Sequence, residues 1–163
     1  MTGKRKPVDG NRQTPIRRAL TRRSNLLPLV ADGIQAIERG HRSYIDTALR
    51  ADFSDSLEID QNLKGGHEQQ HRWDYLLGKA SDGSIVGLEP HSAKTDQVSK
   101  VIKKREMALL QLQMHLKPTA TVSKWFWVAS GNVHFANTDK ERRILDQNGI
   151  QFVGTKPMKK HLL

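Results

Sequence analysis

Asp74 and Glu89 are carboxylates on two segments that the sequence predicts to be neighbouring strands. Paired strands bring such side chains together, and with the backbone carbonyl of Pro90 they would form a set of hard oxygen ligands. Mg²⁺ or Mn²⁺ bound there can polarise a phosphodiester and lower the pKa of an attacking water. The pattern therefore predicts metal-dependent phosphodiester hydrolysis, with Asp74, Glu89 and Pro90 as the metal ligands.

A histidine follows at a position where it could assist this reaction. His91 lies two residues after Glu89, so both side chains project from one face of an extended strand. Its imidazole can act as a base near neutral pH or, when protonated, stabilise charge on a phosphate. Lys94, five residues after Glu89, and Lys103 in the next helix are alternative cations for this role.

The neighbours of Glu89 favour a functional interpretation over a structural one. Acidic residues on hairpins usually face solvent and carry no chemistry. Glu89, however, stands between Leu88 and Pro90 in an otherwise apolar strand. A carboxylate is costly to bury there without a partner or an ion. We therefore expect Glu89 to have one or the other.

A second motif, His67-Glu68-x-x-His71, matches the letters of a zinc peptidase helix. In such a helix the two histidines bind zinc from one face and the glutamate activates the water. Here two glycines precede the motif and two glutamines fill it, so no apolar stripe is present to bury a helix. We expect a polar loop, and a zinc peptidase is the third of our alternatives.

Local patterns predict the elements that would position these residues. Alternating residues in "RWDYLLG" and "IVGLEPH" flank the turn sequence "KASDGS", which predicts a β-hairpin. Apolar residues at helical spacing predict a long helix over 96–116, capped by Thr95 or Asp96 and ended by Pro118. The other predicted elements are a helix over 28–48 with a break near Gly40, strands over 53–60, 124–130 and 150–154, and a helix over 139–148 that begins after Thr138 and stops at Gly149.

The long helix is predicted to turn its lysines to solvent. Its apolar residues form one stripe, and Lys100, Lys103 and Lys104 fall largely off that stripe. Lys103 and Lys104 would contact phosphates if their face bordered a cleft. On the 124–130 strand, Trp125 and Trp127 are expected to be core residues rather than platforms for nucleic-acid bases.

The predicted elements together imply an α/β fold, a small mixed sheet with helices packed against it. Their order, with Asp74 on one hairpin strand and Glu89 on the next, resembles the PD-(D/E)xK, or restriction-endonuclease-like, nuclease superfamily. The resemblance covers roughly residues 28–155. It implies an αβββαβ core and hydrolysis of DNA or RNA with Mg²⁺ or Mn²⁺. A carboxylate from the first helix often joins the metal site in this superfamily, and Glu38, Asp32 and Asp46 compete for that position.

The chain departs from the superfamily pattern at two positions. Trp73 rather than proline precedes Asp74, and His91 occupies the lysine position of the (D/E)-x-K motif. In the superfamily that lysine orients the water and stabilises charge on the phosphate. If neither His91 nor a nearby lysine takes over this task, the chain would bind nucleic acid, or a protein partner, without cleaving anything. That binding module is our second alternative.

Charge is concentrated at the two ends of the chain. The net charge is +10, and residues 1–24 hold eight basic residues against one acidic residue. We expect a flexible basic tail over 1–24, a neutral domain over 25–155 and a basic tail over 156–163. Basic tails can bind a nucleic-acid backbone through counterion release, or simply aid solubility. The candidate contacts are Arg17, Arg18, Arg22, Arg23, Lys103 and Lys104.

Composition bounds the setting in which the protein acts. The 163 residues include no cysteine, which excludes disulfides and thiolate metal sites and is compatible with a reducing cytoplasm. No apolar run is long enough to span a bilayer, and no signal peptide is recognisable. We expect a cytoplasmic protein whose partner is nucleic acid and not a membrane, with a homodimer left open.

Overall fold

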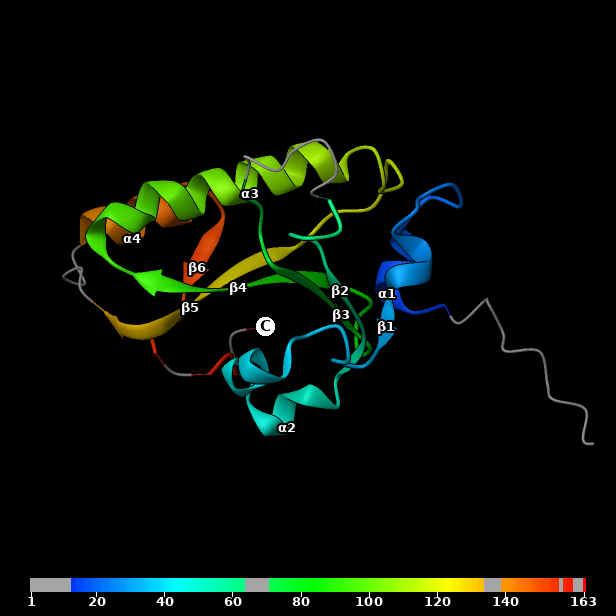
Figure 1. The fold of residues 1–163 in the computed structure, drawn as a ribbon, viewed down its shortest axis with the longest axis horizontal. Coiled ribbons are helices and arrows are strands. Elements are labelled where there is room, and N and C mark those ends of the chain that lie inside the picture. Colours follow the sequence, from blue (N-terminus) through cyan, green and yellow to red (C-terminus); the bar gives the residue numbers. More distant parts are fainter. Residues whose placement is uncertain (1–12, 64–70, 134–138, 156, 160–162) are drawn as a thin grey trace, which may run out of the picture.

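A six-stranded mixed sheet forms the centre of the molecule (Figure 1). The computed structural model describes residues 13–63, 71–133, 139–155, 157–159 and 163. The strands lie side by side in chain order, antiparallel from the first to the fourth and parallel from the fourth to the sixth. They are β1 (Ala31–Asp32), β2 (Phe53–Glu58), β3 (Tyr75–Lys79), β4 (Ile85–Ala93), β5 (Lys124–Val133) and β6 (Ile150–Phe152).

Helices cover both faces of this sheet. In Figure 1, α3 and α4 lie together over one face, α2 lies on the opposite face, and α1 lies near β1. The α-helices are α1 (Pro15–Ala19), α2 (Thr47–Arg50), α3 (Val98–Leu112) and α4 (Asp139–Gln147), and three short 3-10 helices are η1 (Leu27–Leu29), η2 (Arg39–Tyr44) and η3 (Thr95–Gln97). Because β4 and β5 are parallel, η3 and α3 form the crossover between them. None of the helices described here has the length and apolar character to cross a membrane.

The central strands divide the core into two layers. On β5, Trp125 and Trp127 pack with the apolar residues beneath α3 and α4, whereas Phe126 and Val128 belong to the cluster on the other face. This alternation follows from the two-residue period of a strand. Both tryptophans are at most 2% exposed, so the prediction that they are core residues is confirmed.

Most of the predicted elements are present. The hairpin, the strands near 53–60, 124–130 and 150–154, the long helix and the helix after residue 138 are all confirmed as to type and place. The cap of the long helix differs from the prediction, because η3 precedes α3 and the N-cap residue Gln97 makes no side-chain capping bond. Thr138 lies outside the described residues.

The predicted helix over 28–48 is wrong. That stretch contains η1, β1, η2 and the start of α2, separated by turns. Gly33 takes a left-handed backbone with φ of 56°, which a continuous helix would not tolerate. Ile37 and Ile45 lie in different short segments of this stretch, and both side chains are buried. Their helical spacing therefore reflects separate contacts with the core and not one helical face.

Part of the segment predicted to be a flexible tail is packed onto the domain. Residues 15–19 form α1, and Ile16 is fully buried. Asp55 on β2 holds this helix by accepting hydrogen bonds from the backbone N–H groups of Ile16 at 2.9 Å and Arg17 at 3.2 Å. Near the other end of the chain, Met158 is also buried and bridges to Ile45. The domain therefore extends beyond residues 25–155 in both directions.

Candidate active site

The hairpin register places Asp74 opposite Glu89. Tyr75 pairs with Leu88, so Asp74, one residue before β3, lies across from Glu89 on β4. The backbone N–H of Asp74 donates to Oε2 of Glu89 at 2.9 Å. The Glu89 side chain is fully buried, and that of Asp74 is 20% exposed. The structure thus brings together the two carboxylates that the sequence singled out.

Lys104 of α3 joins these two carboxylates. Its ammonium contacts Oε1 of Glu89 and lies 3.6 Å from Oδ1 of Asp74. Lys104 was predicted to face solvent, which is wrong, because its side chain is only 12% exposed. Val101 and Ala108, three residues before and four after, are fully buried. These positions share one helix face, so the helical spacing carried the signal that Lys104 points to the sheet.

Burial and the nearby Glu89 perturb the ionisation of Asp74. The pKa of Asp74 is raised to about 7, first because burial disfavours its charged form and next because Glu89 lies close by. Lys104 opposes this shift. Burial by itself would lower the pKa of Lys104, but the carboxylates of Glu89 and Asp74 outweigh it, so that the pKa is raised. Burial and the proximity of Glu89 therefore outweigh the stabilisation that Lys104 gives to an ionised Asp74.

His91, two residues after Glu89 on the same face of β4, also contacts this glutamate. Its Nδ1 lies 3.4 Å from Oε1 of Glu89, and its Nε2 lies 2.8 Å from Oε1 of Gln97. Both partners are oxygen acceptors, so an imidazolium satisfies both contacts. The hydrogen bond to Glu89 raises the pKa of His91. Gln97 did not enter the sequence-based prediction, since nothing in its local pattern marks it.

The donor set at this site suits a hard divalent cation. The two carboxylates are ligands of the type that Mg²⁺ and Mn²⁺ prefer, and Pro90, whose carbonyl was the third predicted ligand, lies between Glu89 and His91 on β4, opposite Val128 of β5. A bound cation would also favour the ionised form of Asp74, whose pKa is raised first by burial and next by Glu89. Within the described part of the chain, no three histidine or acidic side chains gather as a metal cluster. The fit therefore rests on two carboxylates and backbone or water oxygens.

The other candidates for the catalytic cation lie farther out. Lys94 is exposed and precedes η3, and no contact of it with Asp74 or Glu89 is present in the described structure. Lys103 is also exposed, one residue from the lysine that does reach the carboxylates. The prediction had the right helix but the wrong residue.

The three acidic candidates from the predicted first helix have different surroundings. Glu38 lines a pocket of about 460 Å³ that Asp74 also lines. Asp32 forms an ion pair with Arg17 at 2.9 Å, and Asp46 accepts from the backbone N–H of Ala48 to cap α2. The latter two are engaged in local structure.

The basic residues near the N-terminus lie away from the carboxylates. Arg17 binds the protein itself, through Asp32 and the carbonyl of Val30. Arg18, Arg22 and Arg23 are exposed, and Leu20 between them bridges to Leu116, beyond the C-terminal end of α3. Lys104, by contrast, lies in the first half of that helix. Arg17 therefore has a structural role, and the other three lie at the opposite end of α3 from the site.

The zinc motif falls largely outside the described residues, which exclude His67 and Glu68. His71 is exposed and lies in an irregular segment that leads into β3. It contributes instead to a pocket beside the carboxylates.

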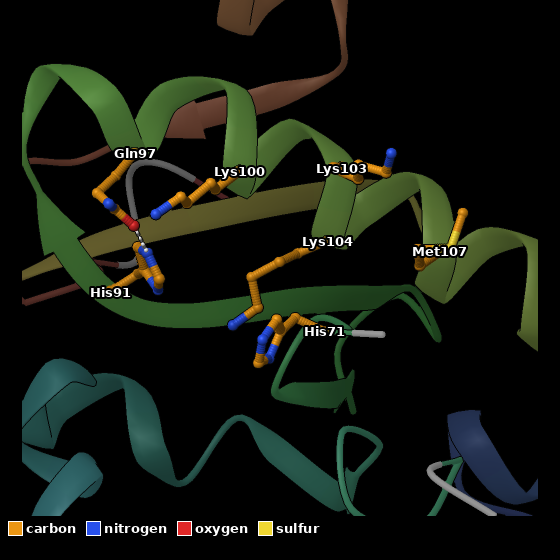
Figure 2. A pocket seen from close by; sticks show the side chains of 7 residues that line it. All are labelled: His71, His91, Gln97, Lys100, Lys103, Lys104 and Met107. Carbon is orange, nitrogen blue, oxygen red and sulfur yellow. Dashed lines mark hydrogen bonds between the residues drawn. The ribbon is translucent and has the colours of Figure 1, made fainter. Parts of the chain in front are cut away.

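That pocket has a volume of about 640 Å³ and opens between α3 and the hairpin (Figure 2). It is lined by His71, His91, Gln97, Lys100, Lys103, Lys104 and Met107. In Figure 2 the Lys100 side chain extends from α3 toward Gln97 and His91, and the Lys104 side chain extends toward His71. Two residues that contact Glu89, Lys104 and His91, are therefore also walls of a basic pocket.

The chain matches no protein-family model, and neither a curated protein nor a solved structure is significantly similar to it. The geometry of this site is therefore the basis on which a function is proposed for the chain.

Proposed function

We propose that this protein is a metal-dependent nuclease that hydrolyses phosphodiester bonds in DNA or RNA. The observation that carries the proposal is the position of Lys104, which contacts Glu89 and Asp74 on one side and lines a basic pocket on the other. Carboxylates that bind a cation, beside ammonium and imidazole groups that bind a phosphate, suit phosphoryl chemistry.

The arrangement of elements supports placing the chain in the restriction-endonuclease-like group. The acidic hairpin β3–β4 is followed by α3 and then by β5 parallel to β4. This order agrees with the αβββαβ core of that superfamily from the second strand onward. The α-helix before β1 in this chain is short, since α1 has five residues and only the 3-10 helix η1 lies between α1 and β1.

Each side chain has a distinct task in the proposed reaction. Asp74 and Glu89 would hold Mg²⁺ or Mn²⁺, which would supply Lewis acidity toward the phosphate and a more acidic bound water. Lys104 would place a positive charge at Nζ, next to both carboxylates, and so take the role that the motif lysine has in the superfamily. His91 would keep its imidazolium toward the phosphate while Gln97 and Glu89 orient the ring.

One observation favours the alternative of a non-catalytic binding module. The carboxylate of Glu89 already accepts from the backbone of Asp74 and contacts both Lys104 and His91. A glutamate satisfied by the protein in this way has less need of a metal ion. In that case the basic pocket would bind nucleic acid, and no bond would be cleaved.

A cleavage assay separates the two functions. Single-stranded DNA, double-stranded DNA and RNA would be incubated at low salt with Mg²⁺, Mn²⁺ or EDTA. We expect metal-dependent cleavage that falls at least about 100-fold in Glu89→Gln and in Lys104→Met. Glu106→Gln is the matched control, because Glu106 is exposed on α3.

Circular dichroism would establish that each variant is folded. Absence of cleavage on every substrate by the folded wild-type protein would reject the nuclease and favour the binding module. Equal activity of Glu89→Gln and Glu106→Gln would reject this site as the catalytic centre.

A further inference from the structure

Among the residues that the structure describes, the basic pocket carries more positive charge than the neighbouring carboxylates neutralise. Lys104 is balanced by Asp74 and Glu89. Lys100 and Lys103 line the same pocket, and among the described residues neither has a carboxylate within ion-pair distance. None of the described residues that line the pocket is acidic. Unneutralised ammonium groups in a concave site attract anions, and phosphate is the anion that the proposed reaction supplies.

The shape of the pocket limits what can enter it. Its volume of about 640 Å³ falls in the range of roughly 300–1,000 Å³ that is typical of sites for small ligands. It is walled by α3 on one side and by His71 and His91 on the other. A nucleotide fits within such walls, whereas a base pair would have to remain outside them.

One part of the lining suits a base or sugar rather than a phosphate. Met107 lies one turn beyond Lys103 on the same face of α3 and is partly buried. Its thioether and the methylene stems of the lysines offer apolar surface beside the charged groups. Phosphate near Lys100 and His91 and a nucleoside toward Met107 would therefore use both ends of the pocket.

We propose that this pocket binds an unpaired strand, taking the phosphate and nucleoside next to the bond that is cleaved. The inference rests on the proposed function, which places the cleaved bond at the carboxylates. His91 and Lys104 contact Glu89 and also line the pocket, so the pocket adjoins that bond. Single-stranded DNA or RNA, or the frayed end of a duplex, is then the substrate class, and a continuous duplex is excluded from the pocket.

The test measures binding without cleavage. Fluorescence anisotropy of a short fluorescein-labelled oligonucleotide, as single-stranded DNA, as RNA and as duplex DNA, would be recorded in EDTA over a range of salt concentrations. We expect Lys100→Gln and Lys103→Gln each to weaken single-strand binding roughly fivefold and to lower the salt slope by about 0.7. Lys117→Gln is the control, because Lys117 is an exposed lysine outside this pocket.

Each outcome decides the proposal. The proposal is supported if Lys100→Gln and Lys103→Gln weaken single-strand binding and Lys117→Gln does not. Duplex DNA should bind the wild type more weakly than a single strand does, and these substitutions should leave duplex binding unchanged. Equal losses for single strand and duplex would overturn the preference for an unpaired strand. Losses no greater than those of Lys117→Gln, or no single-strand binding by the wild type, would overturn the site. EDTA removes metal-dependent cleavage from this test, so binding is measured by itself. Strand binding that depends on the pocket, together with no cleavage in Mg²⁺ or Mn²⁺, would reject the nuclease and keep this inference. Cleavage in Mg²⁺ or Mn²⁺ that Lys100→Gln leaves unaffected would keep the nuclease and overturn this inference.

Discussion

The backbone N–H of Asp74 and the carboxylate of Glu89 are joined by a hydrogen bond of 2.9 Å. The acidic pair is therefore asymmetric. Replacing the side chain of Asp74 leaves this bond in place, whereas replacing that of Glu89 changes the acceptor. Because Glu89 is fully buried and Asp74 is partly exposed, substitutions at the two carboxylates should affect stability differently.

Asp74→Asn should flatten the dependence of stability on pH. The pKa of Asp74 in the fold is about 7, above its ordinary value of 3.8. Between these values the folded protein holds a proton that the unfolded chain has released, so the free energy of unfolding falls as pH rises from about 4 to about 7. Asparagine does not titrate, so the variant should equal the wild type near pH 4 and exceed it by up to about 4 kcal/mol near pH 8.

Urea unfolding at the two pH values measures this difference. Asp96→Asn serves as the control, since Asp96 is exposed on η3. If the wild type and Asp74→Asn lost stability in parallel as the pH rose, Asp74 would not be the responsible group.

Mg²⁺ or Mn²⁺ should stabilise the folded protein above pH 7, where Asp74 is ionised. A ligand that binds only the native state stabilises it by about 2.7 kcal/mol at one hundred times its dissociation constant. Thermal unfolding with increasing metal would show a rising midpoint for the wild type and for Glu106→Gln. The rise should vanish in Asp74→Asn and in Glu89→Gln. A metal-induced rise that survived in both carboxylate variants would place the ion elsewhere.

Lys104→Met should destabilise the fold, because it leaves the fully buried Glu89 without its ammonium partner. Breaking a buried ion pair by removing one member typically costs about 3–5 kcal/mol. Adding Glu89→Gln to Lys104→Met should recover part of that loss, since the uncompensated charge is then gone. A double-mutant cycle by urea unfolding would give a coupling of more than about 1 kcal/mol. Additive effects would mean that water, and not Lys104, solvates Glu89.

Gly78→Ala should be destabilising by about 1–3 kcal/mol through overpacking. A Cβ at Gly78 on β3 would overlap Oδ1 of Asp55, the residue that holds α1 on the sheet. Gly40→Ala is the matched control, because a Cβ there would meet nothing within 4 Å. Thermal unfolding of the two variants should separate them clearly. Similar midpoints would show that Asp55 can move without releasing α1.

The parts of the fold that the sequence predicts well are those with regular local patterns. The hairpin around Asp82-Gly83 and the helix α3 each repeat one period for several residues, so their type follows from the spacing alone. Over 28–48 the same reasoning fails. Ile37 and Ile45 contact one core from separate turns, which imitates helical spacing without a helix.

In the candidate site, too, one contact can be predicted from the sequence and another cannot. Proximity of Asp74 and Glu89 follows from strand pairing, which is a local property of a hairpin. The partner of Glu89 comes from α3, and which lysine reaches it depends on the rotation of that helix over the sheet. Lys104 was assigned to the polar face because it is charged, although its spacing from Val101 and Ala108 places it on the buried face.

The lysine of this site stands on a helix, fifteen residues after the glutamate that it contacts. Each helical residue adds about 100° of rotation. Insertion or deletion of one residue between Val98 and Lys104 would thus turn the ammonium away from the sheet and bring a neighbouring side chain to its place. A length change in the 80–84 turn, at the far end of the hairpin from Asp74, would leave the contact intact. Related chains should therefore vary freely in length at that turn and hardly at all along the first two turns of α3.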